Sequence, residues 1–114
     1  MTNPKRGEMR LELAGKRFDC RITMDVMIRV ETAIGKSILK VASDLQNADM
    51  TALQMVAFLT PVLRSSGEDI REKDVQSLLW DAGLPEGLRA IAEVIAFLIG
   101  GVDNEGNEPV AVNS

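Results

Sequence analysis

Two short segments near the amino terminus alternate between apolar and polar residues, and a glycine-containing turn separates them. Residues 8–13 are charged at every even position and apolar at every odd one. After Ala14-Gly15, residues 17–22 repeat the alternation with Phe18, Cys20 and Ile22 as the apolar set. Alternation with a period of two on both sides of a turn is typical of a half-buried β-hairpin. We therefore predict a hairpin over residues 8–22 with one face in the core.

Charge pairing favours one register for this hairpin. If Ala14-Gly15 is a two-residue loop, opposite charges face each other in three pairs, Glu12–Arg17, Arg10–Asp19 and Glu8–Arg21. A loop at Gly15-Lys16 would instead bring like charges together, and each cross-strand pair matters by about 0.2–1 kcal/mol. Turn chemistry favours the second loop, because Ala14 does not readily adopt the positive φ of a type I′ turn, whereas Gly15-Lys16 suits type II′. We expect the first register.

From Thr23 onward the apolar spacing becomes helical. Capping residues, glycines and prolines predict helices over about 24–34, 38–46, 52–64, 72–82 and 85–99. The helices are expected to bury Met24, Met27, Ile28 and Ile34 in the first; Ile38, Val41, Ala42 and Leu45 in the second; Leu53, Val56, Ala57, Leu59 and Leu63 in the third; and Val75, Leu78 and Leu79 in the fourth.

These elements predict an α+β fold in which an amino-terminal hairpin packs on about five short helices. The length of 114 residues fits a single domain, which we place at residues 1–101. Residues 102–114 are polar and rich in turn formers, so we expect a flexible tail. Thr51 and Gln54 match a capping box at the start of the third helix. Pro61 lies inside that helix, where we expect a kink or a break near residues 57–61.

The residues that usually carry catalysis are scarce. The chain has no histidine and only one cysteine, Cys20, which lies in the apolar phase of its strand. The acidic residues at 68, 69, 72 and 74 lack the order of a calcium loop and suit the first turn of a helix. We therefore expect no enzymatic activity, no cofactor and no metal site.

Charge and hydropathy bear on the kind of partner. A net charge of −4 argues against general nucleic-acid binding. The apolar run at residues 88–99 is shorter than the roughly 20 residues that span a bilayer, so we expect no membrane insertion. Residues 1–10 lack the apolar core of a secretory signal, and a cytoplasmic location is expected.

Partner binding is the remaining functional signal. Between residues 88 and 99 only Arg89 and Glu93 are polar, so the last helix is apolar over most of its circumference. Such a helix is either central to the fold or docks on another chain. We assign Leu88, Ile91, Ala92, Ile95, Leu98 and Ile99 to the core face, and Ala90, Val94, Ala96 and Phe97 to the opposite face.

Five residues are candidates for a partner surface: Met24, Met27, Trp80, Val94 and Phe97. Methionine adapts to irregular binding surfaces but also fills cores, and Trp80 suits either an interface anchor or a partly buried core position. Burial of Phe97 beneath the hairpin is the alternative to docking through the last helix. The partner could be a helical protein or a second copy of the chain.

Three segments carry a family resemblance: residues 3–8 (NPKRGE), 11–18 (LELAGKRF) and 30–35 (VETAIG). They resemble the small tail proteins of gene transfer agents and related siphophages, a family grouped with phage tail assembly chaperones. The similarity spans about residues 3–101, and relatives often carry Asp-Gly where this chain has Ala14-Gly15.

The resemblance implies a non-enzymatic phage or prophage tail assembly chaperone in the cytoplasm of the bacterial host. Such a protein coats the tape measure protein and helps to recruit tail tube subunits. Some descriptions of the family imply a structural tail tube component instead. A small cytosolic enzyme or regulator is the alternative from another class, and the absence of a catalytic constellation argues against it.

Overall fold

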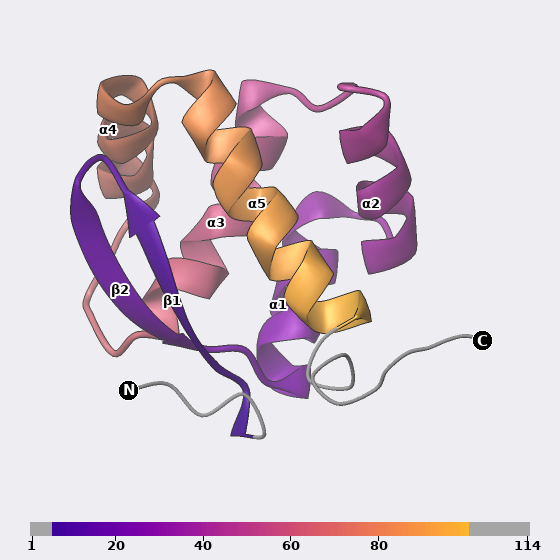
Figure 1. Cartoon of the computed structure of the whole chain (residues 1–114), viewed down its shortest axis with the longest axis horizontal. Coiled ribbons are helices and arrows are strands. Elements are labelled where there is room, and N and C mark those ends of the chain that lie inside the picture. The colour runs from indigo at the N-terminus through magenta and orange to yellow at the C-terminus, as the bar shows by residue number, and fades with distance from the viewer. Residues whose placement is uncertain (1–5, 101–114) are drawn as a thin grey trace.

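The computed structural model describes residues 6–100, so the expected tail at 102–114 lies outside the described residues. A two-stranded antiparallel sheet, β1 (Glu8–Leu13) and β2 (Lys16–Arg21), precedes five helices. The helices are α1 (Met24–Ile34), α2 (Ile38–Gln46), α3 (Ala52–Arg64), α4 (Glu72–Ala82) and α5 (Leu84–Ile99). The predicted α+β class is confirmed, and Figure 1 shows the hairpin along one side of the helices.

The hairpin adopts the register that charge pairing favours. Ala14 and Gly15 form the loop with φ values of 54° and 77°, as a type I′ turn requires. Leu11 faces Phe18 and Met9 faces Cys20, and the three opposite-charge pairs lie opposite each other as predicted. The Arg10–Asp19 and Arg21–Glu8 pairs have N–O distances of 3.1 and 3.3 Å. The Glu86 carboxylate further holds the turn by accepting the Ala14 backbone N–H at 3.1 Å.

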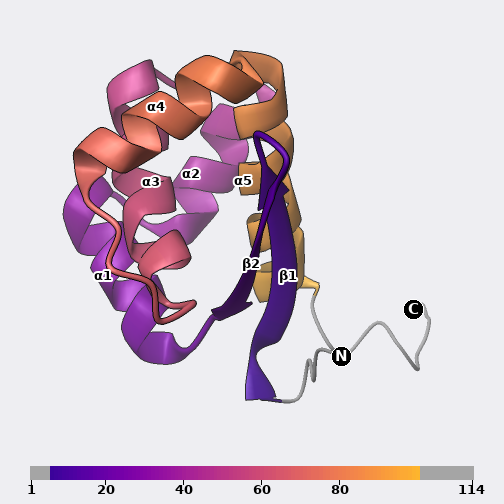
Figure 2. The same ribbon diagram turned by 90° about the vertical axis from the view of Figure 1, so that its left-hand side faces the viewer.

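The core lies between the hairpin and the helices. Leu11, Leu13, Phe18 and Cys20 form the buried face of the hairpin, each at most 1% exposed. Figure 2 shows the hairpin standing beside α5 and α3, whose buried faces meet it. Among the described residues, no helix is long and apolar enough to cross a membrane.

The buried face of α1 differs from the prediction. Val26 and Val30 are buried, whereas Met24 and Ile28 are 67% and 53% exposed. The predicted face would include position 31, which is a glutamate. The observed face is continued by Met27 and Ile34, which pack against the core from partly buried positions. The prediction for Met24 and Ile28 was wrong because large apolar residues occur on both sides of this helix.

In α3 the described helix continues through Pro61 to Arg64. The predicted break is therefore wrong, and the kink that was expected as the alternative stays a prediction. Proline costs the hydrogen bond to the Ala57 carbonyl, but the flanking residues Phe58, Leu59, Val62 and Leu63 are all buried. Their packing holds the helix on both sides of the proline. The predicted capping box at Thr51 and Gln54 is confirmed by reciprocal hydrogen bonds of 3.1 and 3.0 Å.

The face of α5 that packs inward is rotated from the prediction. The buried residues are Gly87, Ala90, Ile91, Val94 and Ile95. Ala92 and Ala96 are exposed together with Arg89 and Glu93. The exposed alanines are small, so α5 has a solvated face even though its sequence is apolar almost throughout. The prediction that Val94 binds a partner is wrong, because Val94 is 0% exposed.

Candidate protein-binding groove

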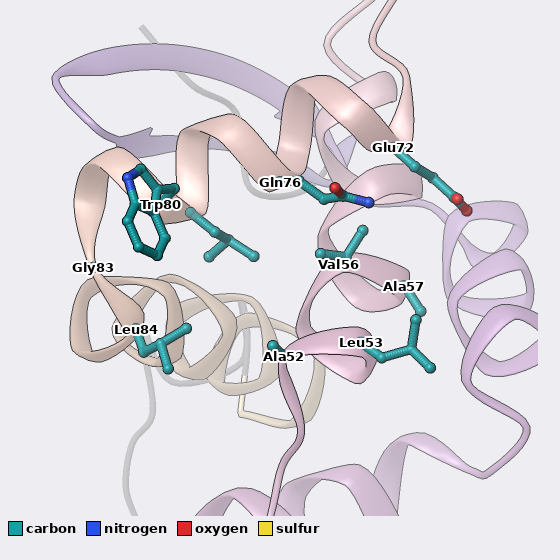
Figure 3. A pocket seen from close by; sticks show the side chains of 10 residues that line it. Ala52, Leu53, Val56, Ala57, Glu72, Gln76, Trp80, Gly83 and Leu84 are labelled. Carbon is teal, nitrogen blue, oxygen red and sulfur yellow. The ribbon is translucent and has the colours of Figure 1, made fainter.

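An open groove lies between α3, α4 and the first residues of α5. Its volume is about 590 Å³. Figure 3 shows α4 as one wall and α3 as the other, with Trp80 and Leu84 together at one end and Glu72 at the opposite end. The lining residues are Ala52, Leu53, Val56, Ala57, Glu72, Gln76, Leu79, Trp80, Gly83 and Leu84.

Local sequence explains how these side chains are brought together. Glu72, Gln76 and Trp80 follow one another at intervals of four, which places them along one face of α4. Gly83, with a φ of 92°, ends α4 and leads directly into α5 at Leu84. A β-carbon would strain this turn. The turn sets Leu84 across from Trp80 only four residues after it.

Close packing of α5 on its neighbours supports that end of the groove. A β-carbon added at Gly87 would come within 2.5 Å of Leu79 Cδ2 and 2.7 Å of Met55 Cε. Gly87 therefore allows α5 to approach α3 and α4 closely. Both side chains that meet it, Met55 and Leu79, are buried in the core.

The groove combines a buried floor with an exposed apolar rim. Val56 and Leu79 are 8% and 4% exposed and belong to the floor. Leu53, Trp80 and Leu84 are 80%, 87% and 51% exposed. Large apolar side chains gathered at an open concave surface are typical of protein interaction sites. Glu72 and Gln76 are the polar side chains in the lining, so the groove suits apolar groups of a partner.

A second hollow continues from the groove along α3 toward α1. It shares Ala57 and Glu72 with the groove. Its charged lining includes Arg29 and Asp25, whose side chains form an ion pair at 2.8 Å. The concave surface along α3 is thus apolar toward Trp80 and charged toward α1.

The residues predicted from sequence to bind a partner do not form one site. Trp80 lines the groove, and its exposure rules out the alternative of a core position. Met24 is exposed on α1 but does not line the groove. Met27 and Phe97 are partly buried against the core, and Val94 is fully buried. Only Trp80 therefore contributes to this site.

Sequence reasoning missed Leu53 and Leu84. Leu53 was assigned to the core face of α3, whereas Met55, Phe58 and Val62 are buried in the structure. Val56, Leu59 and Leu63 on the predicted face are buried as well, at the same intervals of three and four, so no spacing in the sequence would have turned Leu53 outward. Leu84 lies just before Pro85 in a glycine-rich stretch, and no pattern in the sequence marks it as part of a surface.

Cys20 occupies the core position that its strand phase predicts. It is 1% exposed, and burial raises the pKa of its thiol to about 11, with Asp19 adding to the rise and a hydrogen bond with Ser65 opposing it. The thiol is therefore protonated at neutral pH and poorly suited to act as a nucleophile. Within residues 6–100, no group of three acidic or cysteine side chains is arranged to hold a metal ion.

Comparison of the chain with family models, with curated proteins and with solved structures finds no match.

Proposed function

We propose that this protein is a non-enzymatic binding module of the tail assembly chaperone type. In this proposal it holds an apolar helical segment of a tape measure protein in the groove between α3 and α4. The exposed rim of Leu53, Trp80 and Leu84 around a buried floor is the observation that supports the proposal. The resemblance to the small tail proteins of gene transfer agents and siphophages supplies the identity of the partner.

The chemistry of the groove fits such a partner. An amphipathic helix presents apolar side chains at intervals of three and four residues, and a hydrophobic groove binds that face. A cavity of this size accommodates a few large side chains. The small contact area suits reversible binding. A chaperone needs reversible binding because it must release the tape measure protein when tail tube subunits assemble on it. The proposed setting is the cytoplasm of the bacterial host.

The test uses Trp80, the only tryptophan of the chain, as both anchor and probe. The protein is titrated with an apolar helical fragment of a tape measure protein, and indole fluorescence reports binding. An exposed indole that becomes buried should shift its emission to shorter wavelength. Trp80→Ala removes the large apolar anchor at one end of the groove, and loss of such an anchor typically costs at least 2 kcal/mol, or about 30-fold in Kd. Calorimetry measures the variant's affinity.

Leu39→Ser is the matched control for a groove variant, Leu53→Ser. Both leucines are strongly exposed, at 71% and 80%, but Leu39 lies on α2 and does not line the groove. We expect Leu53→Ser to weaken binding and Leu39→Ser to leave it unchanged. Equal affinity of both variants and of Trp80→Ala would contradict the groove as the binding site. No binding by the wild-type protein would contradict the proposed function.

A further inference from the structure

Glu72 brings a negative charge to a groove whose other lining residues are uncharged. Its side chain is exposed. Figure 3 shows it at the end of the groove away from Trp80 and Leu84, and this is also where the groove meets the second hollow along α3. A partner that fills the groove therefore brings part of its surface against this carboxylate.

Capping of α4 does not depend on Glu72. The Asp74 carboxylate fills that role by accepting the Arg71 backbone N–H at 2.9 Å. Within the described residues, the Glu72 carboxylate forms no hydrogen bond and no ion pair. The carboxylate is thus free to pair with a cation that a partner supplies.

The arginines of the second hollow have other contacts. Arg29 forms its ion pair with Asp25 at 2.8 Å. Arg64 Nε donates to the Ile70 carbonyl at 2.6 Å. Because neither arginine pairs with Glu72, the negative charge at this end of the groove is not neutralised from within the described part of the chain.

The length of the groove determines where a partner helix would need its positive charge. Glu72 precedes Trp80 by eight residues on α4, which is about 12 Å at 1.5 Å per residue. Two residues seven positions apart on a partner helix share one face and lie about 10 Å apart. The long side chain of lysine or arginine covers the difference. A helix that packs an apolar residue on Trp80 thus places the seventh residue along beside Glu72.

Helix dipoles favour one direction for such a partner. α4 begins at Glu72, so the positive end of its dipole lies at that end of the groove. The negative, carboxyl-terminal end of a partner helix is favoured there, and a basic residue in its last turn is favoured by its own dipole. The partner helix is therefore expected to run antiparallel to α4, with its basic residue after the apolar one.

We propose that the groove binds a helix that carries an apolar residue and, seven positions later, a lysine or arginine. The apolar residue packs on Trp80 and Leu84, and the basic side chain pairs with Glu72. This inference rests on the proposed function, because it defines the chemistry of the segment that the groove would hold.

Two synthetic helical peptides that differ at one position test the pairing. Both carry leucines at positions i, i+3 and i+4 in a background of alanine and glutamine, and position i+7 is lysine in one and glutamate in the other. Calorimetry measures the Kd of each peptide. We expect the wild-type protein to bind the lysine peptide about tenfold more tightly, because attraction and repulsion at an exposed position are each worth about threefold. This difference should shrink at high salt.

Charge reversal on the protein should reverse the preference. Glu72→Lys is expected to bind the glutamate peptide about tenfold more tightly than the lysine peptide. Asp81→Lys is the matched control, because it makes the same change in net charge on the same helix but Asp81 does not line the groove. It should keep the preference of the wild-type protein.

A milder variant covers the case in which Glu72→Lys does not fold. An acid in the first turn of α4 is favoured by the helix dipole, so circular dichroism checks that each variant is folded. Glu72→Gln removes the charge without reversing it. It should bind the two peptides with equal affinity.

The outcomes separate this inference from the proposed function. Equal affinity of the wild-type protein for the two peptides, or a lysine preference that survives both Glu72 variants, would overturn the pairing with Glu72. If Trp80→Ala weakens the binding of both peptides in that case, the groove remains the binding site and the proposed function stands. Binding of neither peptide would overturn the inference, and the titration with the tape measure fragment decides the proposed function separately.

Discussion

Truncation of Val94 tests the packing of α5, the element whose orientation most affects where a partner can bind. Val94 is 0% exposed within the core. Val94→Ala removes two methyl groups, and at roughly 0.8 kcal/mol per buried methylene the lost transfer free energy is about 1.6 kcal/mol. The unfilled cavity raises the cost to about 2.5 kcal/mol. Alanine's higher helix propensity stabilises the variant by about 0.5 kcal/mol. The expected net loss in the free energy of unfolding is therefore about 2 kcal/mol.

Urea unfolding followed by circular dichroism measures this loss as a lower midpoint at unchanged slope. A domain of this size should also melt about 10 °C lower. Leu39→Ala is the control, since Leu39 is 71% exposed and its truncation should change stability by no more than about 0.5 kcal/mol. Equal midpoints for the two variants, with partner binding lost only in Val94→Ala, would refute the assignment of Val94 to the core.

Two further predictions concern the hairpin turn and a buried carboxylate. Ala14→Asn should stabilise the protein by about 1 kcal/mol, because asparagine tolerates the positive φ of 54° at this position; a lower melting temperature would contradict this. The Asp44 carboxylate lies 2.5 Å from Lys36 Nζ, and this hydrogen bond, helped by Lys40, holds the pKa of Asp44 below its ordinary value of 3.8. A lowered pKa stabilises the fold above the unfolded pKa and loses that effect as the pH falls through the folded value. Asp44→Asn should therefore lower the urea midpoint at neutral pH, with a difference from wild type that shrinks below about pH 4.

The hairpin was predictable because two independent signals determine it. The alternation fixes which face is buried, and the charges at 8, 10 and 12 against 17, 19 and 21 fix the register. Ala14 disfavours a positive φ, which opposes this register, but the strain is confined to that one residue. Three cross-strand pairs and the burial of Leu11 and Phe18 outweigh the strain at that residue.

The buried faces of the helices were harder to predict because several helices carry large apolar residues on both sides. Met24 and Ile28 on α1, like Leu53 on α3, fit a helical period as well as the residues that are buried. Only packing between elements decides between the two faces. On α5 the difficulty was the opposite: Ala92 and Ala96 counted as apolar in the pattern, yet they tolerate solvent because they are small.

The same ambiguity explains why the groove could not be read from the sequence. Leu53, Trp80 and Leu84 belong to three helices, and no spacing links Leu53 to the other two. What joins them is tertiary: the turn at Gly83 folds α5 back beside α4, and Gly87 lets α5 approach Met55 and Leu79 closely. Each of the three helices therefore contributes one exposed apolar residue to the same groove. The apolar pattern of a single helix does not show which of its residues are exposed. The candidate binding surface arises where exposed apolar residues of neighbouring helices lie around one groove.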